Sequence, residues 1–338
     1  MKRRIFFILL IMSAIALLCN SCITTVHPPV PTEQPTVSNE AKAKADQARK
    51  QAMDFSSNTY FPSDWEEAEK QYAAANDDAS FNAAADAYNA LFKKTIPLYA
   101  QAREDEMMVV REELIATGFT DVFPKYLKDV DDLAISAEDK YKAGDYTGAK
   151  DTASAALKGY ETLLAGAKTY LARQEVIDRG FTKYDNDNFL KADEVSQKAI
   201  DAYDAGNKDA ALAAAEEAQL RYNTVISNGW TVYSSERKDA ASKERELAIA
   251  DKANIASRET FRNGEASLED AKALYAEGKY SEAAIAFVDA EANFAISRKE
   301  TEEKRIIAQE VMKAAGEKIG ESSETAIEAE KIIEGGSR

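Results

Sequence analysis

From Glu40 onward, apolar residues recur three and four positions apart, and Ala, Glu, Lys and Gln fill the positions between them. This spacing is typical of helices that bury one face. No stretch shows the sustained alternation of apolar and polar residues that a half-buried strand requires. Because no proline follows Pro124, the sequence beyond that residue permits long helices. The pattern predicts an all-α fold, either an α-solenoid or an elongated bundle.

An internal repeat organises the helical region. Three segments follow the template Ala-x3-Tyr-x2-Gly-x4-Ala, starting at Ala137, Ala199 and Ala271, and a looser fourth copy contains Ala68 and Tyr72. The copies follow one another at similar distances along the chain, as expected for a repeated structural unit. We therefore expect a helical domain over residues 40–319, built from four hairpin units at about 40–101, 102–167, 168–234 and 235–319.

Each copy of the template predicts a hairpin of two helices. Ala and Tyr four residues apart share one face of the first helix. Gly144 can adopt the left-handed conformation that ends a helix, and Asp145, or Asn207 in the next copy, can cap the helix that follows. Tyr146 is placed to fill the base of its hairpin. The second helix of each hairpin is long and runs, for example, from about residue 146 to residue 179.

Aromatic loops are expected to connect one hairpin to the next. They lie at residues 55–65, 118–127 and 180–190, with a weaker fourth copy at residues 261–268. Pro62 and Pro124 suit the first turn of the helices that follow two of these loops. The segment Asn228-Gly229-Trp230 interrupts a long helical stretch and predicts a kink or a loop, with a partner-facing Trp230 as the alternative.

An aromatic residue followed by an arginine recurs along the long helices. The pairs are Tyr99 and Arg103, Tyr170 and Arg173, Tyr233 and Arg237, and Phe294 and Arg298. The default interpretation is a core aromatic beside an arginine at the rim of the core. The alternative is a row of arginines that face a ligand.

The first residues are typical of an export signal followed by a tether. Basic Lys2 to Arg4 precede an apolar run that is too short to span a bilayer comfortably and ends at Cys19-Asn20-Ser21-Cys22. The segment resembles the bacterial lipoprotein signal, which implies a signal peptide over residues 1–21 and lipidation of Cys22. Ordinary secretion and an uncleaved anchor are the alternatives. Prolines predict an extended tether over residues 22–39, and residues 320–338 are expected to form a flexible tail.

Two family resemblances rest on these segments. The Ala–Tyr–Gly stretches resemble the tetratricopeptide motif, although that family repeats about every 34 residues. The aromatic loops, the Ala-rich hairpins and a relaxed lipoprotein signal, with Cys19 and Asn20 before Ser21, are together similar to spirochaetal lipoproteins of the treponemal membrane protein A type. This resemblance covers most of residues 41–300. It implies an anchored, antigen-like envelope protein with no assigned chemistry.

The composition argues against several kinds of functional site. The formal charge of −16 argues against nucleic-acid binding, which needs a basic surface. The one histidine, His27, belongs to the tether, and both cysteines belong to the export signal. The acidic segment at residues 185–188 lacks the glycine and the glutamate of a calcium loop. We therefore expect no catalytic residue, no metal site and no cofactor, in a protein that is not an enzyme.

The sequence favours a non-catalytic scaffold for protein–protein interaction in the cell envelope, because stacked hairpins expose extended surfaces. The expected partners are the membrane, through the lipid anchor, and envelope proteins that the sequence does not identify. The protein would lie on the periplasmic face of the outer or the inner membrane. Two alternatives stay open: an adhesin or antigen exposed at the cell surface, and an accessory protein that binds a ligand for an uptake system.

Overall fold

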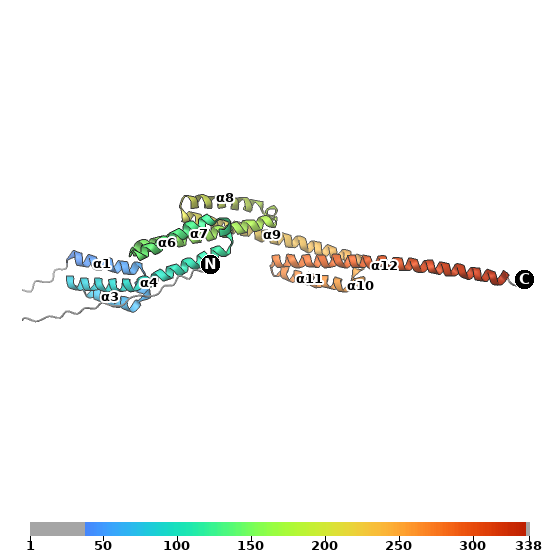
Figure 1. Cartoon of the computed structure of the whole chain (residues 1–338), viewed down its shortest axis with the longest axis horizontal. Coiled ribbons are helices and arrows are strands. Elements are labelled where there is room, and N and C mark those ends of the chain that lie inside the picture. The colour runs from blue at the N-terminus through green and yellow to red at the C-terminus, as the bar shows by residue number, and fades with distance from the viewer. Residues whose placement is uncertain (1–37, 336–338) are drawn as a thin grey trace, which may run out of the picture. The chain divides into compact units, whose positions relative to one another are not determined.

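The computed structural model describes residues 38–335, and every regular element in that range is a helix (Figure 1). In chain order these are α1 (Asn39–Asp54), α2 (Ser57–Tyr60), α3 (Pro62–Ala74), α4 (Asp78–Ala116), α5 (Phe119–Val122), α6 (Pro124–Lys142), α7 (Tyr146–Asp178), the 3₁₀ turn η1 (Phe181–Lys183), α8 (Asn186–Asp204), α9 (Lys208–Ala250), α10 (Ala253–Ala256), α11 (Arg258–Ala276) and α12 (Tyr280–Gly335). The all-α prediction is confirmed. The predicted signal peptide, Cys22 and the tether up to residue 37 lie outside the described residues.

The chain divides into two compact bodies, Met1–Leu98 and Tyr99–Arg338. The N-terminal body contains α1, α2, α3 and the first part of α4. In its three-helix unit, the backbone N–H of Ser38 donates to Asp78 Oδ1 at 2.6 Å, which joins the beginnings of α1 and α4. Arg49 of α1 pairs with Glu69 of α3 at 2.6 Å. Alanines of α1 and the rings of Phe55 and Tyr88 fill the core between the helices.

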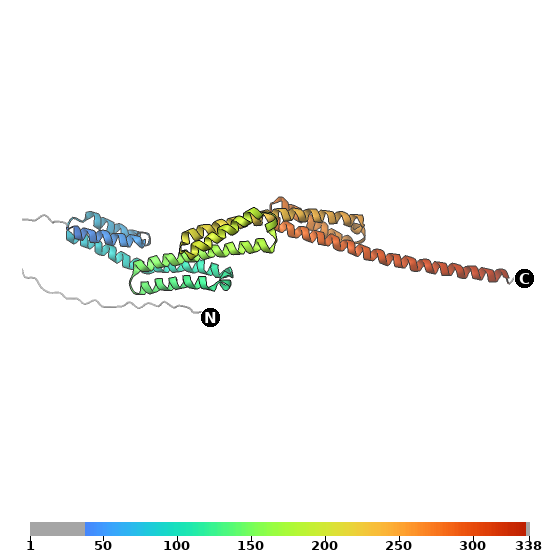
Figure 2. The same ribbon diagram turned by 90° about the horizontal axis from the view of Figure 1, so that it is seen from above.

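The C-terminal body repeats this arrangement three times. Its three-helix units are α4–α6–α7, α7–α8–α9 and α9–α11–α12, so that α7 and α9 each serve as the third helix of one unit and the first helix of the next (Figure 2). The first and third helices of a unit run parallel, since Thr162 and Thr169 of α7 bond to the carbonyls of Lys208 and Ala215 of α9. The predicted hairpins are therefore parts of larger units that share helices.

Each unit of the C-terminal body has its own hydrophobic core, in which a few rings are packed among many small side chains. The largest buried residues of the three cores are Leu114 and Tyr160, then Phe181 and Tyr222, then Phe287 and Phe294. Alanine makes up about 18 % of the chain, and alanines occupy most of the remaining core positions. Small side chains allow the helix axes to approach closely, and the few aromatic rings fill the remaining space between them.

The hairpin turns form as the sequence predicts. Gly144, Gly206 and Gly278 adopt positive φ values of 81°, 78° and 77°, which cost glycine little and other residues about 1 kcal/mol. Asp145 then accepts a hydrogen bond from the N–H of Gly148, and Asn207 accepts one from Ala210. These caps satisfy backbone donors at the start of α7 and α9.

The prediction for the fourth aromatic loop is wrong. Residues 261–268 lie inside α11, and the true loop is at residues 251–257, where Lys252 has a φ of 65° and precedes α10. The glycine inside this segment, Gly264, is a packing residue. A Cβ on Gly264 would lie 2.8 Å from the ring of Phe294, so glycine is what lets α11 approach α12.

Two further predictions differ from the structure. The segment at residues 228–230 forms no loop, because α9 continues through it, and the buried Gly229 lies against the ring of Phe181. Residues 320–335 belong to α12, although a flexible tail was predicted from Gly320. Ala, Glu, Lys and Ile are tolerated well in a helix, and an exposed glycine inside one costs only about 1 kcal/mol.

A candidate binding groove between two hairpins

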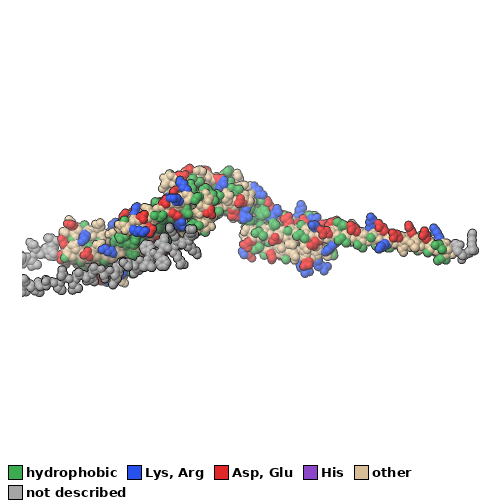
Figure 3. All heavy atoms as spheres, in the orientation of Figure 1, with side chains coloured by type: hydrophobic (Ala, Val, Ile, Leu, Met, Phe, Trp, Pro, Cys, Tyr) green, Lys and Arg blue, Asp and Glu red, His purple; other side chains and the backbone are tan. Residues whose placement is uncertain are grey.

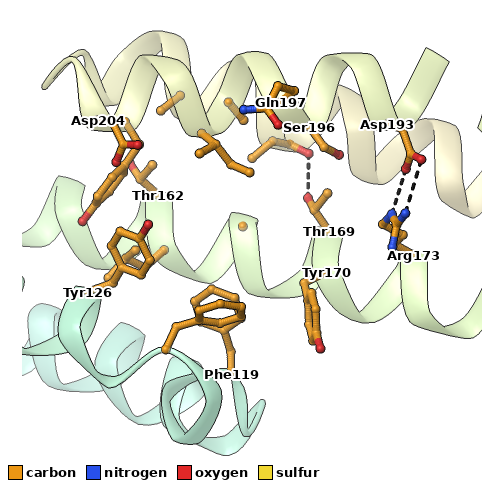
Figure 4. Close-up of a pocket in the computed structure, with 18 residues that line it drawn as sticks. Phe119, Tyr126, Thr162, Thr169, Tyr170, Arg173, Asp193, Ser196, Gln197 and Asp204 are labelled. Atoms are coloured by element: carbon orange, nitrogen blue, oxygen red, sulfur yellow. Dashed lines mark hydrogen bonds and ion pairs between the residues drawn. The ribbon is translucent and has the colours of Figure 1, made fainter. Parts of the chain in front are cut away.

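A groove with a volume of about 480 Å³ opens between two successive hairpins of the C-terminal body (Figure 4). The loop containing α5 and the start of α6 form one side, α8 forms the other, and α7 and the start of α9 form the floor. The residues that line it are Phe119, Phe123, Tyr126, Thr162, Leu163, Gly166, Thr169, Tyr170, Arg173, Asp193, Ser196, Gln197, Ala199, Ile200, Tyr203, Asp204, Ala211 and Ala215. Most of the surface that they present is apolar.

Aromatic rings make up one side of the groove. Gly118 is left-handed at a φ of 72° and turns the chain so that Phe119 and Phe123 follow on α5 and its C-terminal end. Their ring centroids are 4.8 Å apart, and each lies 5.9 Å from the ring of Tyr170 on α7. Across the groove, Tyr126 meets Tyr203 of α8 edge to face at 5.5 Å. Rings in such contacts hold one another in place and present a fixed apolar wall.

The floor of the groove is made of small residues. Gly166 has nothing within 4 Å of the position that a Cβ would occupy, so the groove reaches the backbone of α7 there. The Thr169 hydroxyl donates to the carbonyl of Ala215 at 2.8 Å and so joins α7 to α9. The Thr162 hydroxyl donates to Lys158 O at 2.7 Å in the same helix. Both hydroxyls therefore serve helix packing and leave the floor mainly apolar.

Polar side chains gather at one end of the groove. Arg173 Nε lies 2.8 Å from Asp193 Oδ1, and the hydroxyl of Tyr222 donates to the same carboxylate. Burial raises the pKa of Asp193, but the hydrogen bonds from Arg173 and Tyr222 outweigh burial and hold that pKa below its ordinary value. Burial raises the pKa of Tyr203 to about 12, so its phenol stays neutral. Arg173 and Asp193 are engaged with each other, whereas Asp204 lies at the opposite end of the groove (Figure 4).

The pair at this end of the groove belongs to a set that recurs in every unit. An arginine of the first helix bonds to an acid of the second helix, in the pairs Arg49–Glu69, Arg111–Asp131, Arg173–Asp193 and Arg245–Glu265. A tyrosine of the third helix donates to that acid in three units, from Tyr88, Tyr160 and Tyr222, and the residue at this position in the fourth unit is Phe294. Sequence analysis missed this set.

A signal for this set was nevertheless present. Every arginine precedes its acid by the same number of positions, so the arginines and the acids recur in step along the chain. The pattern becomes visible when the four units are aligned by these arginines and acids and not by the tyrosines of the hairpins. In the N-terminal unit the hairpin tyrosine lies closer to its arginine than in the later units, because the second helix there is shorter.

The arginines of the aromatic–arginine pairs are all engaged in ion pairs. Arg103 pairs with Glu106, Arg173 with Asp193, Arg237 with Glu291, and Arg298 with both Glu244 and Asp251. Of the four, Arg173 lines the groove. For the other three arginines, the structure therefore supports the default interpretation, in which each lies at the rim of the core.

Two other predicted features have structural roles. Asp185, at the start of the acidic segment, accepts a hydrogen bond from the N–H of Asn188 and caps α8. Trp230 packs against the ring of Phe181 at 5.2 Å and lies under Arg179, whose guanidinium carbon is 4.5 Å from the ring centroid. Its ring is half-buried. Neither feature needs a ligand or a partner to explain it.

Within residues 38–335, no helix is both long enough and apolar enough to cross a bilayer. The same range contains no group of three or more His, Cys, Asp and Glu side chains arranged to hold a metal ion.

Comparison with known proteins gives one informative similarity. No family model matches the sequence, and no solved structure matches it. Treponemal membrane protein A of Treponema phagedenis is 28 % identical to this chain over 216 residues, which cover 62 % of this chain and 60 % of the relative. The chain thus matches less than two thirds of the relative's length. The resemblance expected from the hairpins and the aromatic loops is confirmed at this level of identity.

Proposed function

We propose that this protein is a lipid-anchored, non-catalytic scaffold of the cell envelope that binds partner proteins through the groove between its hairpins. The observation that carries the proposal is the groove itself, about 480 Å³ of largely apolar space walled by fixed aromatic rings. Binding sites are typically apolar hollows with a few polar groups at their edge. Similarity to a protein named as a membrane protein supports the location in the envelope.

The polar groups of the groove support binding over catalysis. Arg173 and Asp193 neutralise each other, and Gln197 donates to Asp201 on its own helix. General acid–base catalysis needs a titratable group poised to exchange a proton with substrate. Here Arg173 and Asp193 are engaged with each other and with Tyr222, and most of the surface left for a partner is aromatic and aliphatic. An apolar segment of a partner protein is the ligand that such a surface fits.

Proximity labelling in intact cells tests the scaffold. Ile200 lines the groove and is 50 % exposed, whereas Ile135 lies on α6 outside the groove and is 55 % exposed. We expect Ile200→Glu to lose labelled partners that the wild type and Ile135→Glu both retain, because a charge in the groove opposes apolar binding. Identical partner sets for the two variants, or no partner above background, would contradict the proposal.

The anchor is tested separately. Lipidation at Cys22 would hold the body to a membrane, and the acyl chains of a lipoprotein supply the two or more chains that stable anchoring needs. Cys22→Ser should abolish labelling by a fatty-acid probe, and continued labelling would point to Cys19 or to another anchor. Protease treatment of intact cells distinguishes a periplasmic protein, which is protected, from an adhesin or antigen at the surface, which is digested.

The same groove supports a second candidate function, which is binding of a small apolar ligand for an uptake system. Its volume lies within the range of about 300–1,000 Å³ that is usual for ligand pockets. Native mass spectrometry of the purified protein would then show a bound molecule that Ile200→Glu loses and Ile135→Glu keeps. A spectrum with no retained ligand would favour the scaffold alone.

A further inference from the structure

The last part of α12, residues 305–335, exposes apolar side chains along its whole length and is called here the α12 extension (Figure 3). Its eight large apolar residues are Ile306, Ile307, Val311, Met312, Ile319, Ile327, Ile332 and Ile333, each at least 45 % exposed. Helices in water obtain most of their stability from the packing of an apolar face. A helix of this length, projecting beyond α10 and α11 as a single rod, therefore presents an interaction surface.

Small residues of the extension continue a stripe that is buried in the preceding unit. Phe287, Phe294 and Thr301 are buried and lie seven residues apart on α12. The same seven-residue step continues through Ala308, Ala315, Ser322 and Ala329. Four residues after each of these small residues come Met312, Ile319, Ala326 and Ile333. Alternate steps of four and three residues define the seam of a left-handed coiled coil.

We propose that the α12 extension binds the same extension of a second copy of this chain, as an antiparallel coiled coil. With Ile319 of one copy opposite Ser322 of the other, Met312 faces Ala329. The same register places Ala308 opposite Ile333, and Ala315 opposite Ala326. Three of the four layers then match a large side chain with a small one, so that core volume is even along the seam. A parallel pair would stack Met312 on Met312 and Ile319 on Ile319, with alanine layers between them.

Charge favours the same orientation. Residues 305–319 carry three bases and two acids, whereas residues 320–335 carry one base and five acids. A parallel pair would place the two acidic halves side by side, which is repulsive. An antiparallel pair places each acidic half beside the half that carries most of the bases. The sequence of the extension is thus complementary to its own reverse in both side-chain volume and charge.

Cysteine crosslinking tests the register in the full chain. In detergent-solubilised protein carrying Cys19→Ser and Cys22→Ser, Met312→Cys and Ala329→Cys are made as separate variants. In the proposed pair, residue 312 of one copy faces residue 329 of the other, and the two copies of residue 312 are about 25 Å apart. A disulfide needs Cα atoms within about 7 Å. We therefore expect oxidation to crosslink a mixture of the two variants, while each variant alone stays uncrosslinked.

The other outcomes overturn the proposal. Crosslinking of each variant with itself would show a parallel pair. Absence of crosslinks in every sample, or disulfides only to a different protein added from an extract, would show that a second copy does not occupy this surface.

Sedimentation of the full chain gives an independent measurement. Ile319→Asp places a charge in the seam of both copies, and Ala314→Asp makes the same change in charge on the outer face of the extension. We expect the wild type and Ala314→Asp to sediment as dimers and Ile319→Asp to dimerise at least about tenfold more weakly. Helix content measured by circular dichroism shows whether the Ile319→Asp chain is folded. A monomeric wild type at every concentration, or equal dimerisation of the two variants, contradicts self-pairing.

Discussion

Gly229 shows how a single residue sets the distance between two helices. The residue lies in the middle of α9, where glycine weakens a helix, yet a Cβ at this position would lie 2.4 Å from the ring of Phe181. The ring is almost fully buried, so it cannot swing away from an added methyl group. Close approach of the η1 turn to α9 therefore depends on the missing side chain. Gly166 of α7 is the contrasting case, since a Cβ there would meet open space.

This contrast predicts opposite effects of one substitution. Gly229→Ala should destabilise the C-terminal body by about 1–3 kcal/mol, because the added methyl group overpacks against Phe181. Gly166→Ala should stabilise it by up to about 1 kcal/mol, because alanine restricts the unfolded chain and favours helix. Urea denaturation followed by circular dichroism measures both changes. Equal effects of the two substitutions would show that the ring of Phe181 does not constrain α9.

The recurring arginine–acid–tyrosine sets make stability depend on pH. Burial alone would raise the pKa of Asp131 and Asp193, but the partners Arg111 with Tyr160, and Arg173 with Tyr222, lower both values below the ordinary one. A folded-state pKa below the unfolded value stabilises the fold at pH values above the unfolded pKa of about 3.9. This stabilisation is lost as the pH falls through the folded-state pKa.

Thermal melts at several pH values test this dependence. We expect the wild-type melting temperature to fall as the pH is lowered from 6 to 3. Asp193→Asn should melt lower than the wild type at pH 6 and lose less of its stability over the same interval, because it has no proton to gain at this site. Parallel pH profiles for the two proteins would mean that Asp193 does not contribute to the acid dependence.

At the scale of elements, the connection between the first and second helices of a unit is built the same way each time. The first helix ends, one residue turns left-handed, and a single helical turn leads into the second helix. The left-handed residues are Ser56, Gly118, Gly180 and Lys252, with φ values of 63°, 72°, 64° and 65°. Two of the four are therefore held in a conformation that L side chains rarely adopt, at a cost of about 1 kcal/mol or more each.

Removing that strain should stabilise the connection. Lys252 is exposed, so Lys252→Gly gives up little packing, and we expect it to stabilise the C-terminal body by up to about 1 kcal/mol. The matched control is Lys243→Gly, which changes another exposed lysine inside the right-handed helix α9 and should cost about 1 kcal/mol. Urea midpoints compare the two. Destabilisation by both would show that the Lys252 side chain makes a necessary contact.

The same elements show how far the sequence predicts the fold. The hairpin turns were predictable because Gly144 and Asp145 combine a left-handed residue with a cap, and each needs only local geometry. The fourth loop was missed because its left-handed residue is Lys252, and a lysine followed by the buried Ala253 carries no local signal for that conformation. The segment around Gly264 was wrongly predicted as a loop because the role of this glycine depends on Phe294, which belongs to a different helix.

The groove was predictable only in outline. A cleft between hairpins follows from any stacked helical array, and the aromatic loops identify Phe119 and Phe123 as its neighbours. The opposing residue Tyr203 was identified as a hairpin residue, but its contact with Tyr126 joins two different units. Such contacts are set by the way in which successive units stack, and this depends on small residues of the shared helix α7 such as Gly159, where a Cβ would lie 2.9 Å from Val130. No pattern in the local sequence predicts these contacts between units.

On the scale of the whole molecule, the shared helices determine how a loss of packing in one unit affects the units beside it. In the C-terminal body, α7 and α9 each belong to two units, so loss of packing in one unit loosens a helix of the next. Units that contact only their neighbours follow nearest-neighbour behaviour, in which local opening weakens with distance along the array. The cores around Tyr160, Tyr222 and Phe294 are separate clusters, which fits this behaviour.

Hydrogen exchange of a core variant measures that spread. Phe294 is fully buried, and Phe294→Ala should cost the last unit about 3–5 kcal/mol. We expect amide protection to fall most in α11 and in residues 280–301 of α12, less in α9, and little in α6, which lies two units away. Leu220→Ala, at a position that is 67 % exposed, should leave every helix protected as in the wild type. An equal loss of protection from α6 to α12 would instead mean that the C-terminal body opens as one cooperative block, because coupling through α7 and α9 would then exceed the stability of any single unit.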